Sequence, residues 1–150
     1  MREADCHVLV NSRDTETIWM FLDTFLPQRE CSIAGWLVEE GTEHEKEITD
    51  VEELIEFCIK HPTEPQSIYW RGLNEYSRRH VWVFFTDDSA TIYGLMCFDE
   101  DDTQENELLE RMQKHFGSNI GYVSYVEPPP NSASQYTAIF KSISIHGEPT

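Results

Sequence analysis

The sequence predicts an α+β fold in which a mostly antiparallel sheet of about six or seven strands carries three helices packed mainly on one face. Three observations predict it. Short apolar runs rich in β-branched and aromatic residues recur along the chain, and several follow one another directly. Three other segments place their apolar residues at helical spacing. No internal repeat or change in composition marks a boundary, so we expect a single globular domain over residues 1–150.

Seven segments have the composition of β-strands. The most apolar are 81–85 and 91–98, and the residues between them are turn formers such as Asp and Ser. Two strands joined so closely predict an antiparallel hairpin, which we expect at the centre of the sheet. The complete set of expected strands is 6–10, 31–40, 67–73, 81–85, 91–98, 120–126 and 136–145.

Three segments have the 3.6-residue spacing of amphipathic helices. The first has Asp14 as a candidate N-cap, and Pro27 ends its pattern. The last is followed by Gly117, a residue that commonly terminates helices. The expected helices are 15–26, 51–60 and 102–116, and residues 41–50 are expected to form a charged loop.

Charge is the strongest compositional signal, because 28 acidic residues outnumber 11 basic ones and give a formal net charge of −17. A field of this sign repels nucleic acid phosphates and anionic membrane surfaces, so we expect neither as a partner. The same field attracts a basic protein and accelerates its association. The alternative explanation of the charge is solubility alone.

Cysteine usage and the N-terminus bear on the compartment. The four cysteines lie far apart, each within an expected strand or helix, which is typical of reduced thiols rather than of a disulfide framework. The N-terminal residues have neither the basic start nor the apolar core of a signal peptide. No apolar run approaches the roughly 18 residues that span a membrane. We therefore expect a cytoplasmic protein.

Catalytic and metal-binding motifs give little support to an enzyme. Gly-x-Ser-x-Gly, Ser-x-x-Lys and a phosphate-binding glycine loop are missing from the sequence. The run Asp99–Thr103 is similar to the start of a calcium loop, but Gln104 replaces the glycine that its sharp turn needs. Cys58-x-x-His61 offers two metal ligands where a structural zinc site needs four. We expect no cofactor, no metal site and no enzyme activity.

The carboxylates are concentrated, with eleven between residues 30 and 64 and nine between residues 87 and 110. Acidic residues at a helix N-terminus are favoured by the helix dipole and need no functional explanation. Adjacent carboxylates repel one another, so we expect those outside helix starts to form a docking surface for a cationic protein. The candidate partner-binding acids are Glu39, Glu40, Asp87, Asp88, Asp99, Glu100, Asp101 and Asp102.

Aromatic residues near these carboxylates complete the predicted surface. The aromatic side chains of the strand 81–85 are expected in the core. Trp36, Trp70 and Tyr93 lie in strands near the acidic segments, and exposed aromatic residues ringed by acid are typical of binding hot spots. We include these three among the candidate partner-binding residues. Burial in the core is the alternative for each of them.

A small acidic α+β protein with clustered carboxylates such as Glu39–Glu40, Asp87–Asp88 and Asp99–Asp102 resembles, as a class, certain bacterial immunity proteins. These proteins neutralise toxins of polymorphic or contact-dependent secretion systems. The resemblance is one of size, charge and general pattern, and it assigns no role to any single residue. It implies stoichiometric inhibition, in which an acidic face covers the basic active site of a cognate toxin. It also implies a monomer or homodimer whose acidic face stays free.

Two other functions fit the same sequence. A small enzyme or ligand-binding domain would use a pocket near the hairpin and the basic cluster Arg78–Arg79–His80, and it predicts a partly apolar cavity with converging polar groups. A structural or adaptor subunit would bury an open sheet face in a homo-oligomer, and it predicts a self-complementary apolar patch.

Overall fold

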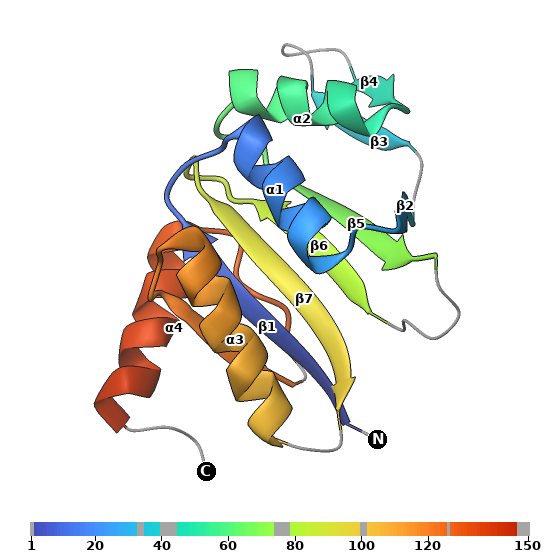
Figure 1. The fold of residues 1–150 in the computed structure, drawn as a ribbon. Coiled ribbons are helices and arrows are strands. Elements are labelled where there is room, and N and C mark those ends of the chain that lie inside the picture. The colour runs from blue at the N-terminus through green and yellow to red at the C-terminus, as the bar shows by residue number, and fades with distance from the viewer. Residues whose placement is uncertain are drawn as a thin grey trace.

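A computed structural model of the chain describes residues 2–32, 35–39, 45–73, 79–99, 102–125 and 127–146, with the backbone alone for 2–3, 97–99, 102–104 and 144–146. Within these residues, four helices and eight strands form a mixed α+β fold, which confirms the predicted fold class (Figure 1). Every strand pairing described is antiparallel. Six strands form the main sheet in the order β2-β5-β6-β7-β1-β8, and β3 pairs with β4 in a separate small sheet.

The elements alternate along the chain without a long stretch of one kind. The strands are β1 (Arg2–Val10), β2 (Arg29–Cys31), β3 (Trp36–Glu39), β4 (Glu45–Ile48), β5 (Gln66–Gly72), β6 (His80–Phe85), β7 (Thr91–Asp99) and β8 (Gly121–Ser124). The helices are α1 (Thr15–Phe25), α2 (Val51–Lys60), α3 (Asp102–Phe116) and α4 (Ala133–His146). None of the helices in the described ranges combines the length and the apolar content that crossing a membrane requires.

The β6–β7 hairpin lies in the middle of the main sheet, as its apolar strands predict. A tight turn closes it. The Thr86 hydroxyl accepts a hydrogen bond from the Ala90 backbone N at 2.9 Å, and Thr86 N donates to Ala90 O at 3.0 Å. Ser89 takes a φ of 75°, in the left-handed region that few residues adopt, and this lets the short connection reverse the chain.

The two faces of the main sheet are covered differently. Helices α1, α2 and α3, together with the small sheet, enclose the main core on one face, and α1 and α3 lie in front of the sheet in Figure 1. These are the three helices that the sequence predicts. On the opposite face, which we call the outer face, Leu9, Trp82 and Ile92 form a smaller cluster beneath Tyr136 of α4. The fourth helix therefore lies alone on the outer face among the helices described.

The segment 136–145, predicted as a strand, belongs to helix α4, so that prediction is wrong. Its apolar residues recur three or four positions apart as well as alternating, so both patterns fit. Two caps fix the helix start. The Ser132 hydroxyl accepts from Gln135 N at 3.1 Å, and Asp88 accepts from Ala133 N at 2.7 Å. A contact from a distant turn thus stabilises the helix, and no local pattern reveals it.

The predicted strand 31–40 corresponds mainly to β3 of the small sheet, and only its first residue, Cys31, belongs to β2 of the main sheet. Gly35 interrupts it with a φ of 107°, so β2 joins the main sheet and β3 joins the small one. Residues 45–48, expected to be part of a charged loop, form β4. Val38 and Ile48 of the small sheet are both buried in the main core, which explains why so charged a segment is held as a strand.

Candidate functional site

The three aromatic residues predicted to contact a partner are core side chains, so this part of the prediction is wrong. Tyr93 is fully buried and stacks on Phe116, with ring centroids 4.3 Å apart. Trp70 of β5 and Trp36 of β3 are buried in the same core. Each residue occupies the inward position of an alternating strand, so its side chain points at the helices and away from solvent.

Asp88 has a structural role that no local sequence pattern indicates. Its Oδ1 accepts a hydrogen bond from Ala133 N at 2.7 Å and its Oδ2 accepts one from Ser134 N at 3.1 Å. Burial acts to raise the pKa of Asp88, but the hydrogen bonds to its carboxylate outweigh burial and lower the pKa below its usual value. Asp87 beside it is exposed, and its backbone N donates to Asn131 O at 2.9 Å.

The remaining predicted acids are only partly described. Glu40, Glu100 and Asp101 lie outside the described residues, and Asp99 and Asp102 are described by their backbone alone. Glu39 is described and is exposed on β3.

The outer surface of the small sheet brings Glu39 together with an apolar side chain and two further carboxylates. The register places Leu37 opposite Glu47 and Glu39 opposite Glu45, and all four residues are exposed. Leu37 is 63% exposed, the highest value among the large hydrophobic side chains described. Carboxylates directly opposite one another on neighbouring strands repel. This surface therefore combines an exposed apolar side chain with carboxylates whose mutual repulsion destabilises the protein in the absence of a partner.

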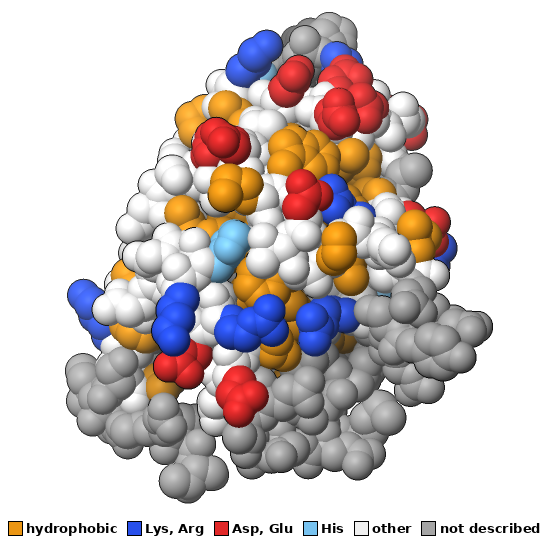
Figure 2. All heavy atoms as spheres, in the orientation of Figure 1, with side chains coloured by type: hydrophobic (Ala, Val, Ile, Leu, Met, Phe, Trp, Pro, Cys, Tyr) orange, Lys and Arg blue, Asp and Glu red, His pale blue; other side chains and the backbone are white. Residues whose placement is uncertain are grey.

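A hollow of about 350 Å³ lies beside this surface, and we call it the acidic hollow. The only nearby lysine of β4, Lys46, pairs with Glu53 of α2 at 3.3 Å and does not line the hollow. Figure 2 shows acidic side chains next to hydrophobic ones over the end of the molecule that α2 and the small sheet form in Figure 1. The lining residues of the acidic hollow are Leu37, Val38, Glu39, Glu45, Glu64 and Pro65.

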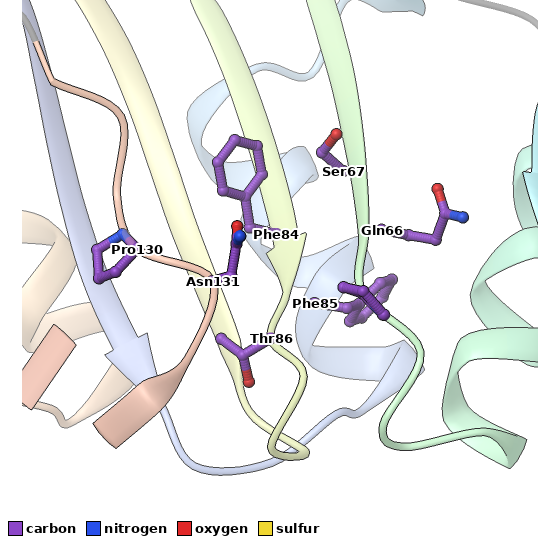
Figure 3. Close-up of a pocket in the computed structure, with 8 residues that line it drawn as sticks. Gln66, Ser67, Phe84, Phe85, Thr86, Pro130 and Asn131 are labelled. Atoms are coloured by element: carbon purple, nitrogen blue, oxygen red, sulfur yellow. The ribbon is translucent and has the colours of Figure 1, made fainter. Parts of the chain in front are cut away.

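A second hollow of about 370 Å³ shares Pro65 with the acidic hollow. Its lining consists of residues 65–67, 84–86 and 130–131, and none of these side chains is ionisable, so we call it the neutral hollow. Figure 3 shows the Phe84 ring between the loop that carries Asn131 and the start of β5. The neutral hollow lies at the turn end of β6, whereas His80 begins the same strand at its other end. Of the basic cluster considered in the sequence, Arg78 lies outside the described residues.

Arg13 holds the walls of both hollows in place. Its Nη1 donates to Cys58 O at 2.6 Å and to His61 O at 3.0 Å, and its Nη2 donates to Glu64 O at 2.9 Å and to Thr86 O at 2.5 Å. Glu64 lines the acidic hollow and Thr86 lines the neutral one. The sequence does not single out Arg13, because a single arginine between a strand and a helix carries no local signal of distant carbonyl partners.

A buried hydrogen-bond chain lies beneath α4. The Tyr136 hydroxyl donates to His7 O at 2.9 Å, so its oxygen accepts from His7 Nδ1 at 2.8 Å. This assigns the proton to Nδ1, and Nε2 then accepts from the Ser124 hydroxyl at 3.0 Å. Burial lowers the pKa of His7 to about 3. A serine hydroxyl hydrogen-bonded to a histidine is the arrangement that enzymes of acyl transfer use. An imidazole this weakly basic is a poor general base, so we interpret this hydrogen-bond chain as structural.

The Cys58-x-x-His61 motif does not form a metal site, because Cys58 is buried in the core and His61 is exposed at the end of α2. Burial raises the pKa of the Cys58 thiol to about 12, so the thiolate that reacts with electrophiles or binds metal does not form. His61 instead makes a hydrogen bond from Nδ1 to Phe57 O at 2.9 Å. No group of three or more His, Cys, Asp or Glu side chains in the described ranges is placed to hold a metal ion.

Comparisons with family models, with curated proteins and with solved structures find no match to this chain.

Proposed function

We propose that this chain is an immunity-type inhibitor that binds a cognate basic protein toxin through the outer surface of the small sheet and the acidic hollow. The observation that carries the proposal is the position of Leu37, 63% exposed and lining one hollow with Glu39, Glu45 and Glu64. An apolar side chain that a partner can desolvate inside a polar ring is the usual composition of a binding hot spot. This replaces the aromatic contacts that the sequence predicts.

Electrostatics favours a cationic partner at this place. Glu39 and Glu45 are cross-strand neighbours, so each raises the energy of the other in the free protein. A lysine or arginine inserted between them replaces that repulsion with charge-assisted hydrogen bonds. The net charge of −17 steers such a partner from a distance, so the association rate falls as salt screens the field.

Inhibition requires no chemistry on either protein. A toxin that acts on nucleic acid or nucleotides presents lysine and arginine side chains to phosphate groups. The acidic surface occupies those side chains in place of the substrate, and the complex is stoichiometric. The cytoplasm is the expected compartment, and the buried thiol of Cys58 suits its reducing conditions.

The test is capture of the partner with matched charge variants. The tagged chain is incubated at low salt with a lysate of its source organism, and bound proteins are identified by mass spectrometry. We expect one stoichiometric basic protein that is toxic when expressed alone and harmless together with this chain. The triple variant Glu39→Lys, Glu45→Lys and Glu64→Lys should weaken binding at least about 30-fold.

The control triple replaces Glu16, Glu107 and Glu110, which are exposed on α1 and α3, with lysine. It changes the net charge equally, so it should mainly slow association, and its effect should disappear as salt rises. Equal loss of binding in both triples at high salt would place the interface elsewhere. A captured partner that is not toxic, or self-association alone, would overturn the immunity proposal.

A further inference from the structure

The neutral hollow supports an inference that does not depend on the protein partner. We propose that it binds an uncharged saccharide unit, with one face of the sugar ring on Phe84 and its hydroxyl groups on the side-chain amide of Asn131 and the hydroxyl of Ser67. The volume of about 370 Å³ lies within the range of roughly 300–1,000 Å³ that small-molecule sites occupy.

Phe84 offers a fixed aromatic surface. Its partly exposed ring packs against Trp82, with ring centroids 4.3 Å apart, and meets Tyr69 edge-on at 5.9 Å. Trp82 in turn lies over Gly94, where an added Cβ would be 1.9 Å from the indole. The ring is therefore positioned before a ligand arrives, which lowers the entropy cost of binding. The C–H groups on one face of a pyranose ring can bury their apolar surface against it.

The polar wall is also formed in advance. Asn131 O accepts from Asp87 N at 2.9 Å, and the helix that follows is capped by Asp88, so the β6–β7 turn holds this loop. The Asn131 side chain makes no hydrogen bond within the described part of the chain. Ser67 pairs with Phe84 across β5 and β6, so its hydroxyl lies on the same face of the sheet as that ring. Gln66 instead pairs with Phe85, and its side chain points away from Phe84 to donate to Leu37 O at 3.0 Å (Figure 3). An amide and a hydroxyl supply both donors and acceptors, as sugar hydroxyl groups require.

The charge of the lining selects a neutral ligand. The residues around the hollow include no ionisable side chain, although 26% of the chain is charged. An anionic sugar would be repelled by the net charge of −17, and the lining has no lysine or arginine with which it could pair. The same field attracts a cationic sugar, but the lining has no carboxylate to pair with its ammonium group, which would lose part of its hydration there. An uncharged sugar incurs neither cost.

The experiment titrates the full chain with glucose and N-acetylglucosamine, and with cationic glucosamine and anionic glucuronate as charged counterparts. Ligand-observed NMR measures binding, and tryptophan fluorescence reports occupancy because Trp82 contacts Phe84. We expect a Kd of about 1–10 mM for a neutral sugar and at least about tenfold weaker binding of both charged ones. Phe84→Ala and Asn131→Ala should each weaken binding at least about tenfold, and Leu73→Ala, at an exposed side chain just past the other end of β5, should leave it unchanged.

Asn131 is exposed and its side chain makes no hydrogen bond to the residues that the structure describes, so Asn131→Ala separates loss of binding from loss of fold. Three results would overturn the proposal: no saturable binding of a neutral sugar up to about 100 mM, equal binding of the charged sugars, or binding unchanged in both variants. Adenosine is titrated in parallel. Tighter binding of adenosine that depends on Phe84 would assign the hollow to a nucleobase and would likewise overturn the saccharide assignment.

Discussion

Asp88 accepts a hydrogen bond at 2.7 Å from the backbone N of Ala133, 45 residues further along the chain. Its second oxygen accepts from Ser134 N, so one carboxylate satisfies two N–H groups that a helix start leaves unpaired. The negative charge also interacts favourably with the helix dipole. The position of α4 on the outer face therefore depends on the turn of the central hairpin.

Replacing Asp88 with alanine should lower the free energy of unfolding by about 1 kcal/mol, the typical cost of losing an N-cap. For a chain of this size the melting temperature should fall by about 2–4 °C. Urea and thermal unfolding measure both quantities. Asp87→Ala is the matched control, because Asp87 is exposed, and it should change stability by less than about 0.5 kcal/mol. Equal losses in the two variants would show that Asp88 does not act as a cap.

His7 should make the folded state sensitive to acid. Its pKa in the folded protein is about 3, against 6.5 for an exposed imidazole, so the unfolded chain takes up the proton first. The stabilisation from the neutral form is fully present above about pH 6.5 and is lost as pH falls towards 3. Between about pH 6.5 and 3, His7 should lower the free energy of unfolding by up to about 1.4 kcal/mol for each unit by which the pH falls.

The measurement is urea unfolding from pH 7 down to about 5 for the wild type and for His7→Gln. The variant should be less stable at pH 7, because its amide replaces a fitted imidazole, but its stability should fall less steeply with acid. Carboxylates contribute to both curves, so the difference between them isolates His7. His80→Gln, at a partly exposed position, controls for loss of an imidazole elsewhere. Parallel curves for the wild type and His7→Gln would contradict the prediction.

Sequence patterns predicted the elements whose side chains and partners are close together in the chain. The β6–β7 hairpin and helices α1, α2 and α3 follow from apolar spacing and local turn residues. Helix α4 could not be predicted, because its cap comes from Asp88 and its buried contact from Tyr136 to His7. The same limit applies to the candidate site. The alternation of a strand does not say which face is inward, so Tyr93 was placed on the wrong side and Leu37 was missed.

Arg13 should not tolerate lysine, although the charge is kept. Its guanidinium donates to four backbone carbonyls, two through each terminal nitrogen, and a lysine ammonium cannot reproduce that planar fork. We expect Arg13→Lys to lower the free energy of unfolding by about 1–3 kcal/mol, since three partly buried carbonyls lose their donors. Arg71→Lys is the control, because the Arg71 pair with Glu30 is exposed and should contribute less than about 1 kcal/mol. A similar small effect at both positions would contradict a role for Arg13 in holding the two hollows.

Gly94 should be required because Trp82 lies against it. The two residues are paired across β6 and β7, and a Cβ on Gly94 would stand 1.9 Å from the Trp82 ring. Gly94→Ala must therefore displace the indole, which should destabilise the fold by about 1–3 kcal/mol and alter tryptophan fluorescence. Since Trp82 supports Phe84, the variant should also disturb the neutral hollow.

Gly117→Ala separates this steric effect from backbone strain. A Cβ there meets nothing within 4 Å, but the φ of 64° lies in the left-handed region. That variant should lose about 1 kcal/mol through strain alone and keep the native fluorescence spectrum. If Gly94→Ala left both stability and fluorescence unchanged, Trp82 would not be packed on the glycine. The aromatic support inferred for the neutral hollow would then be wrong, whatever the result of the sugar titration.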